Sequence, residues 1–427
     1  MTSIRKLEDN LNRVLPSKHL FIVSSSVIIL SYLAFFITCM IWPGDQYGAI
    51  LFRRSDAVDT FMDFYNSIYD AMKGPYEHHV IYPPLCNLVF KMFGMTLSDP
   101  FEGEWVPRGG FTIRELQESQ MCLIYYLGLF LILFFFSMEK LLGDRRSAPK
   151  VFMITAILCS APMLYAVERG NIIIYSFVFL VIYFVYYNDK RIWVRELGYI
   201  CLALSAAIKL YPALFGLLLI KDKRYKDAAR TAIYGLFFTF IPFAFFGGFS
   251  SLKMMIDSIG AFKGAENYGI SFSNGICFIL IGSTGYHPAL SICGLLAAAV
   301  LIISFFLTGK TGQDRWKSIM VLSLSLYGLM ENCSKYNALF VIIPWIIFLC
   351  NSERLRLIDY IYALMFILML APIPLGFFNE IRSYYDRNTM VIAWTGIVMS
   401  VVMIMDVFIG FVSKIKNRSV RTLHNKG

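Results

Sequence analysis

The chain has 427 residues, of which 57% are apolar and 16% charged, and its 39 Lys and Arg outnumber 29 Asp and Glu to give a formal net charge of +10. Soluble domains normally contain about a quarter charged residues and at most about half apolar ones. The apolar residues here come in runs of about 20, the length that crosses a bilayer as a helix. This composition excludes a disordered chain, a disulfide-rich secreted scaffold and a soluble multidomain enzyme. It also favours a membrane over nucleic acid as the partner of the basic residues.

Cofactor and metal signatures are sparse. The nine cysteines are scattered, and the chain has no Cys-x-x-Cys pair and no His-rich cluster. Neither a zinc site nor a disulfide framework is therefore predicted. His78 and His79 are adjacent, and adjacent residues rarely converge on one ion, so no metal ligand is assigned. Without a P-loop or Rossmann fingerprint, nucleotide binding is not expected, and we predict no cofactor.

Eight apolar segments are long enough to be full membrane spans. They are residues 19–42, 118–138, 151–167, 171–188, 229–246, 288–308, 358–378 and 389–412. The first is too long for a signal-peptide core and is interpreted as an uncleaved span. The sequence therefore predicts an all-α, polytopic membrane protein with a single domain over residues 1–427. Residues 43–117 would form a large loop, and residues 413–427 a basic tail.

Clusters of Lys and Arg in the short loops indicate the cytoplasmic side, because such loops carry the positive excess. This rule places both termini in the cytoplasm and the 43–117 loop on the outer face of an inner or plasma membrane. Two further apolar stretches, 196–220 and 318–350, then begin and end inside. Each is predicted to be a broken or re-entrant helix pair, a feature that often lines a binding site. The alternative is that one flanking basic cluster lies outside.

The large loop contains a segment with helical periodicity, residues 59–72. Its apolar residues gather on one side and suit a helix lying in the membrane interface. The opposite side carries Asp59, Asp63, Asn66 and Asp70, at i, i+4, i+7 and i+11. Repulsion and partial burial would raise the pKa of one carboxyl, which makes it a candidate general base. The alternative is an ordinary solvated face.

Motifs within this helix and just after it resemble those of a known family. The segments Asp63-Phe64-Tyr65, Gly74-Pro75-Tyr76 and Tyr82-Pro83-Pro84-Leu85 resemble the first-loop signature of GT-C membrane glycosyltransferases. The similarity is greatest to the polyprenyl-phosphate-mannose-dependent enzymes of glycosyltransferase family 87. The resemblance implies that an acid after the first span is the catalytic base. Asp63 is the first choice, and Asp59 and Asp56 are the alternatives.

Later polar islands supply candidate substrate-binding residues. Lys209-Leu210-Tyr211-Pro212 lies inside an apolar stretch, where an ionisable residue suggests function and Pro212 would break the helix. The alternative is a Lys that reaches an interface. Glu168-Arg169-Gly170-Asn171 forms either a site or a tight turn. Together with positions suggested by the family pattern, the candidates are Lys209, Tyr211, Arg169, Glu168, Asn171, Tyr82, Asn274, Glu331 and Lys335.

The resemblance implies an inverting glycosyltransferase whose donor is a polyprenyl-phosphate hexose, with mannose favoured, and whose acceptor is a glycolipid or glycan. Asp63 would deprotonate the acceptor hydroxyl, and Lys209 would hold the lipid phosphate with help from Arg169 or Lys335. Two other classes stay open, a transporter or flippase of lipid-linked sugars and an O-antigen-type polymerase. Broken helices and a Lys at membrane depth also fit a transporter.

Overall fold

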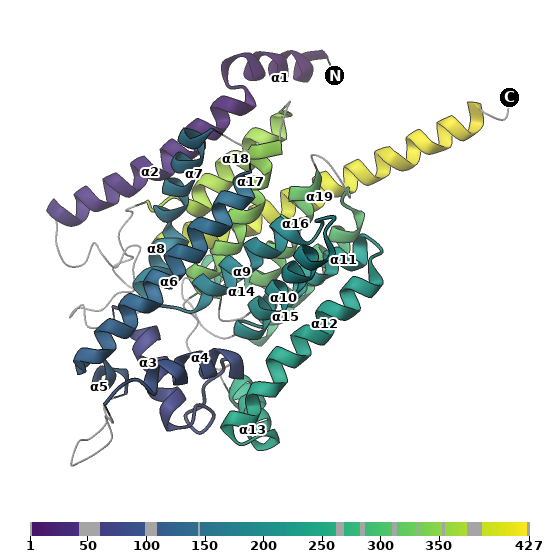
Figure 1. Cartoon of the computed structure of the whole chain (residues 1–427). Helices are drawn as coiled ribbons and strands as arrows, with labels where there is room; N and C mark the ends of the chain where they lie inside the picture. The colour runs from purple at the N-terminus through teal and green to yellow at the C-terminus, as the bar shows by residue number, and fades with distance from the viewer. Residues whose placement is uncertain are drawn as a thin grey trace. The chain divides into compact units, whose positions relative to one another are not determined.

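The structure is a computed structural model that describes residues 2–41, 60–98, 109–143, 146–261, 269–281, 287–309, 314–330, 333–351, 355–373 and 387–424. Within these ranges all regular secondary structure is helical, as the sequence predicts (Figure 1). The chain divides into two compact units. Unit 1 comprises Met1–Phe36 and Glu266–Gly427, and unit 2 comprises Ile37–Ala265. The single membrane domain stays a prediction.

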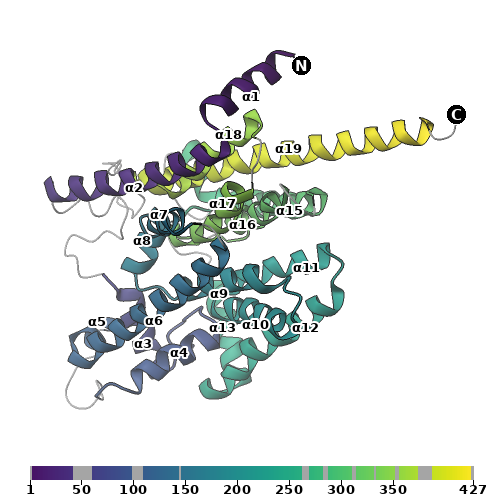
Figure 2. The same cartoon turned by 45° about the horizontal axis from the view of Figure 1, so that its top comes forward.

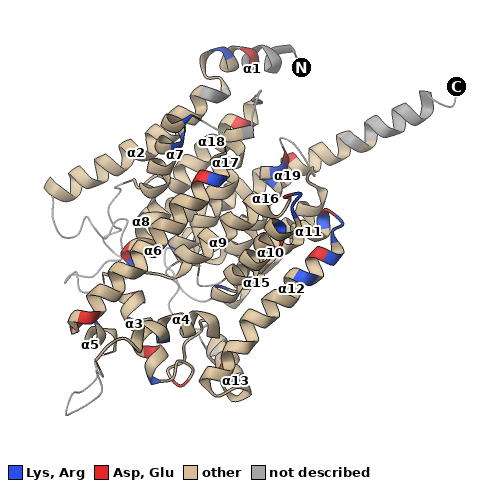
Figure 3. Ribbon diagram, viewed as in Figure 1, with Lys and Arg blue, Asp and Glu red and all other residues tan. Residues whose placement is uncertain are grey.

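Within the part of the chain that the structure describes, five helical segments are long and apolar enough to cross a membrane. They are His19–Ile41 of α2 (Ser17–Ile41), α6 (Gln117–Leu142), Tyr225–Phe246, α15 (Pro288–Leu307), and Arg387–Ser413 of α19 (Arg387–His424). The third of these joins α12 (Tyr225–Phe240) to the 3-10 helix η3 (Ile241–Phe246). Figure 3 shows most of the charged residues near helix ends and in loops. These helices make the protein a multi-pass integral membrane protein.

The predicted count of eight full spans is not confirmed. Residues 151–167 form a pair of helices, α7 (Ser147–Leu158) and α8 (Ala161–Glu168), bent by 60°. The bend follows from extended backbone at Ser160 (ψ 145°) and from Pro162 in the first turn of α8. The spans predicted at 171–188 and 358–378 yield α9 (Ile173–Tyr186) and α18 (Leu357–Leu370), each of 14 residues. Such a helix is about 21 Å long, against a hydrocarbon core of about 30 Å.

Unit 2 is built around α9, whose residues are apolar on nearly every side. Ten of its residues, from Ile173 to Tyr183, are buried, as expected for a helix without a polar face. It packs against α6 and against α10 (Ile192–Ile208). A pair of buried serines, Ser176 and Ser205, joins α9 to α10 at 2.9 Å between their hydroxyl oxygens. The unit continues through the 3-10 helix η2 (Tyr211–Gly216), α11 (Leu217–Lys221), α12, η3 and α13 (Phe249–Ala261).

The first-loop helix is α3 (Met62–Lys73), which packs against α4 (Pro84–Gly94) and α5 (Gly110–Glu115) (Figure 1). Gly74 ends it with a φ of 107°, where the sequence predicts the stop. Its apolar face was expected to lie against lipid, but Phe64 is fully buried against rings of α4 and α6. On the opposite face, Asn66 is exposed but accepts a hydrogen bond from Gly110 N at 3.0 Å. The apolar face of the helix is therefore packed into protein.

Unit 1 contains the second predicted helix pair. Residues 318–350 form α16 (Arg315–Leu329) and α17 (Leu339–Asn351), which pack together. The 3-10 helix η6 (Lys335–Ala338) directly precedes α17. Figure 2 shows α16 and α17 beside each other. The rest of the unit is α1 (Thr2–Val14), α14 (Phe272–Ile281) and the helices α2, α15, α18 and α19 already described.

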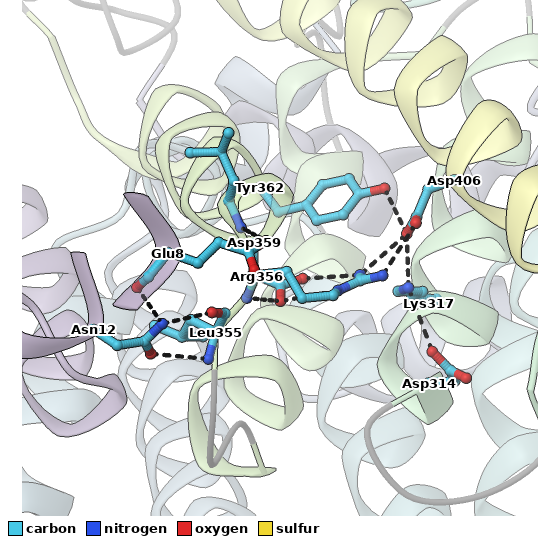
Figure 4. A network of polar contacts seen from close by, with 10 residues as sticks. Glu8, Asn12, Asp314, Lys317, Leu355, Arg356, Asp359, Tyr362 and Asp406 are labelled. Carbon is cyan, nitrogen blue, oxygen red and sulfur yellow. Dashed lines mark hydrogen bonds and ion pairs between the residues drawn. The ribbon is translucent and has the colours of Figure 1, made fainter. Parts of the chain in front are cut away.

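An ionic cluster around Asp406 of α19 ties the elements of unit 1 together at one end (Figure 4). Lys317, at the start of α16, donates to Asp406 Oδ2 at 2.6 Å, and Arg356, just before α18, lies 3.3 Å from Asp406 Oδ1. Arg356 also pairs with Asp359 at 3.1 Å. Lys317 at the start of α16 and Arg356, which follows α17 in the chain, therefore lie at the same end of unit 1. A re-entrant helix pair requires this arrangement. Which side of the membrane this end faces stays a prediction.

The same end receives the N-terminal helix. Asn12 of α1 donates to the Leu355 carbonyl at 2.7 Å and accepts from the Leu355 amide at 3.1 Å. Glu8 accepts from the Leu357 amide, which is one of the orphan donors at the start of α18. These contacts fix α1 to the loop before α18.

Candidate active site

The site begins with the turn between α8 and α9, which receives the first residues of α3. The carbonyls of Glu168 and Arg169 accept hydrogen bonds from Phe61 N at 2.7 Å and from Asp63 N at 3.0 Å. These amides are donors that a helix leaves without partners at its N-terminus. Gly170 has a φ of 63°, and a Cβ there would lie 2.9 Å from the Cβ of Phe64. The turn requires glycine at this point, and it fixes where α3 starts.

This docking places the Asp63 carboxylate against Arg169. The guanidinium donates from Nε to Asp63 Oδ1 at 3.1 Å and also from Nη2 to the same oxygen. The Arg169 side chain is 10% exposed and that of Asp63 is 20% exposed, so the pair is largely removed from water while the carboxylate keeps some access. A buried carboxylate and guanidinium need each other, because either alone would be a costly unpaired charge.

Asn171 holds the other carboxylate oxygen. Its Nδ2 donates to Asp63 Oδ2 at 2.7 Å and lies 3.2 Å from the hydroxyl of Tyr82. Its Oδ1 accepts from the amide of Ile173 at 3.0 Å, which is an N-terminal capping bond for α9. Because a backbone N–H can only donate, this bond fixes the side-chain amide with its nitrogen toward Asp63.

Tyr82 connects this carboxylate to Lys209. The ammonium of Lys209 lies 4.0 Å from the centroid of the Tyr82 ring, a cation–π contact. Lys209 is 6% exposed and stands in extended backbone (φ −138°, ψ 118°) between α10 and η2. The helix break predicted at this motif is therefore present, with Pro212 in the first turn of η2. We call the set Asp63, Arg169, Asn171, Tyr82 and Lys209 the Asp63 site.

The position of Tyr82 is fixed by two residues behind it. Tyr76 donates to the Tyr82 carbonyl at 3.2 Å, and Asn87 lies 3.3 Å from the same oxygen through Nδ2. Asn87 is fully buried in α4 and also donates to the Tyr76 hydroxyl at 3.2 Å. Tyr76 belongs to the Gly74-Pro75-Tyr76 motif, whereas Asn87 was not among the residues predicted from the sequence. The available signal was a lone amide in the apolar run 85–97.

The other candidates are distributed as follows. Tyr211 begins η2, and Glu168 contributes its backbone carbonyl to the start of α3. Asn274 and Lys335 lie in unit 1, where both are buried. The amide of Ile270 donates to the carbonyl of Cys333 at 2.6 Å. This bond joins the segment that carries Asn274 to the segment that carries Lys335.

The remaining candidates Asp56, Asp59 and Glu331 lie outside the described residues. Among the residues that the structure describes, no three His, Cys, Asp or Glu side chains are grouped to hold a metal ion.

The fold and the site define a polytopic membrane protein with a positioned carboxylate and a buried lysine in the same cluster of side chains. The family model of glycosyltransferase family 87 matches residues 81–330, which is more than half of the chain, and the chain belongs to this family. It is therefore a membrane glycosyltransferase. No curated protein and no solved structure matches the chain.

The matched range contains four members of the Asp63 site, namely Tyr82, Arg169, Asn171 and Lys209. Asp63 itself precedes the range. It is nevertheless bonded directly to two matched residues, Arg169 and Asn171. The structure thus attaches the proposed base to the part of the chain that carries the family signature.

Proposed function

We propose that the protein transfers a hexose, with mannose favoured, from a polyprenyl-phosphate donor to a glycolipid or glycan acceptor at the outer membrane face, within a GT-C-like architecture. The observation that carries the proposal is the Asp63 carboxylate, which is held on both oxygens and linked through Asn171 and then Tyr82 to the ammonium of Lys209. A base and a cation close to each other are what this displacement requires.

Asp63 is the proposed general base. A carboxylate oxygen has two lone-pair sites, so Oδ2 can accept from Asn171 and still receive a proton. Asp63 would take the proton of the acceptor hydroxyl as that oxygen bonds to the anomeric carbon. The bond from this carbon to the phosphate oxygen breaks in the same step, through an oxocarbenium-like transition state. A single displacement inverts the anomeric centre.

Lys209 is the proposed cation for the leaving phosphate. The phosphate departs as an anion, so a fixed positive charge away from water stabilises the transition state more than the ground state. Arg169 was a second candidate for this role, but its guanidinium is engaged with Asp63. We therefore assign Arg169 to positioning the base.

An apolar groove next to Lys209 supports a lipid-linked donor. It has a volume of about 510 Å³ and lies among α10, η2, α11 and α12. Leu210, which follows Lys209 in the chain, lines it, and many of its other residues are small. Its members include Ala203, Ala206, Ala213, Gly216, Ala228, Ala232 and Gly235. We place the first isoprene units of the donor in this groove, with the phosphate at Lys209.

The test uses purified protein in lipid nanodiscs with polyprenyl-phosphate-[14C]mannose and a membrane-lipid extract as the source of acceptor. We expect label to appear in an acceptor, and none when GDP-[14C]mannose replaces the lipid donor. Transfer from the nucleotide sugar would contradict the proposed donor. Movement of the lipid donor between leaflets of proteoliposomes without transfer would instead indicate a flippase.

A further inference from the structure

A second polar cavity lies in unit 2, at the end of α3 opposite to Asp63. It has a volume of about 380 Å³. Its walls are the last residues of α3, the Gly74-Pro75-Tyr76 turn, Lys91 of α4 and the segment that joins η3 to α13. Its charged and hydroxyl side chains are those of Lys73, Glu77, Lys91, Ser250 and Ser251. None of these residues belongs to the Asp63 site.

The walls of this cavity are held in place by packing. Tyr76 is 2% exposed, and its ring centroid lies 5.5 Å from that of Phe243. The ammonium of Lys91 lies 5.1 Å from the ring centroid of Phe246. Gly247, with a φ of 93°, adopts a conformation that other residues rarely adopt, and it turns the chain from η3 toward α13. These contacts fix the Tyr76 and Phe246 walls of the cavity.

Its chemistry suits a sugar ring. The carboxylate of Glu77 accepts hydrogen bonds, and the ammonium groups of Lys73 and Lys91 donate them, so both kinds of sugar hydroxyl contact are available. Phe245, Phe246 and Met254 supply apolar surface for the carbon faces of a ring. The charged groups disfavour an acyl chain. The volume is within the range of small-ligand pockets, about 300–1,000 Å³.

We propose that this cavity binds a sugar of the acceptor glycan other than the one that reacts. Asp63 is in the first turn of α3 and Lys73 ends it, so the two ends are separated by about 15 Å along the helix. An acceptor that reaches both points must contain more than one sugar. The Tyr76 wall is also bonded to the Tyr82 carbonyl, which links the cavity to the Asp63 site. The identity of the ligand as acceptor rests on the proposed function.

The first test measures binding alone, by saturation-transfer NMR of α-linked mannotriose and maltotriose with the protein in nanodiscs. We expect saturable binding that weakens about tenfold or more in Glu77→Gln and in Lys91→Met, because each loses a hydrogen bond to a charged group. The exposed-site controls Glu115→Gln and Lys140→Met should bind as the wild type does. Absence of saturable binding of either trisaccharide, or equal binding by all variants, would overturn the proposal.

A transfer assay separates this proposal from the proposed function. With an acceptor present, Glu77→Gln should raise the KM for acceptor about tenfold and leave kcat and the KM for donor unchanged. If the wild type binds trisaccharide through Glu77 but transfers no sugar, the cavity stands and the transferase proposal fails. If transfer proceeds and Glu77→Gln changes neither binding nor KM, the cavity proposal fails alone. Thermal unfolding of each variant verifies that it is folded.

Discussion

Asn171 and Asp63 are joined by a hydrogen bond of 2.7 Å between Nδ2 and Oδ2, although 108 residues separate them in the chain. The amide that makes this bond is oriented by the start of α9, since its Oδ1 accepts from the Ile173 amide. The direction of the Asp63 carboxylate is thus set by the backbone of a buried helix. A base held in this way needs no rearrangement when the acceptor arrives.

Replacing Asn171 should separate positioning from stability. Asn171→Ala removes both the Asp63 bond and the α9 cap, so we expect kcat to fall about tenfold or more and stability to fall by about 1 kcal/mol. Asn171→Ser keeps an oxygen that can cap α9 but is too short to hold Asp63. We therefore expect it to recover stability without recovering kcat, as measured by thermal unfolding and steady-state transfer. Recovery of both in Asn171→Ser would show that the cap alone matters.

Lys209→Met should weaken the handling of the donor phosphate. Methionine replaces the aliphatic part of the lysine side chain but removes the charge beside Tyr82. We therefore expect the KM for donor to rise and kcat to fall, each by about tenfold or more. Lys209→Arg should retain part of the activity, and Lys140→Met at an exposed position should retain all of it. Donor titrations of the three variants check this. An unchanged KM and kcat in Lys209→Met would remove Lys209 from the site.

Asp70 of α3, which lies outside the candidate membrane spans, gives a pH dependence. Burial raises the pKa of its carboxyl from 3.8 to about 6, with a smaller opposing effect of His78. The folded state therefore favours the protonated form, and stability from this group is present below about pH 4 and is lost as the pH rises through about 6.

Asp70→Asn removes this loss. Its free energy of unfolding should exceed that of the wild type by an amount that grows to about 1–3 kcal/mol between pH 4 and pH 7. Thermal unfolding in nanodiscs across this range measures the difference, with Glu115→Gln as the matched control. Parallel profiles for wild type and Asp70→Asn would contradict the assignment.

Asp406→Asn should destabilise unit 1 without changing the chemistry. Lys317 and Arg356 lose a shared partner, but each keeps another carboxylate, Asp314 at 3.3 Å and Asp359 at 3.1 Å. We therefore expect a loss of about 1–3 kcal/mol rather than the larger cost of an unpaired buried charge. The measurement is thermal unfolding, together with transfer activity per folded molecule. A large fall in that specific activity would instead give the Asp406 cluster a functional role.

The sequence allowed the local features of the site to be predicted. A Lys followed by Tyr-Pro in an apolar stretch predicts a broken helix, and the break is present at Lys209. The Glu168–Asn171 island lies between two apolar runs, and it forms the turn that receives α3. These signals are local, because Pro and Gly constrain the backbone where they occur.

The long-range features could not be predicted in the same way. Periodicity places Asp63 on a helix face but says nothing about the partner on that face, and the partner is Arg169, 106 residues away. The same limit applies to Asn66, whose bond to the amide of Gly110 spans 44 residues. The predicted span count is also not confirmed, because hydropathy alone does not reveal a bend such as that between α7 and α8.

The central claim is that Asp63 is the base of sugar transfer, and the most direct measurement is the rate of transfer from polyprenyl-phosphate-[14C]mannose by Asp63→Asn in nanodiscs. We expect a loss of about 100-fold or more, since the amide keeps the shape of the carboxylate but cannot take the proton. Asp59→Asn and Asp56→Asn, measured in parallel, should retain the wild-type rate. Transfer by Asp63→Asn at the wild-type rate, with loss in either of the other two variants, would contradict the account and move the base to that residue.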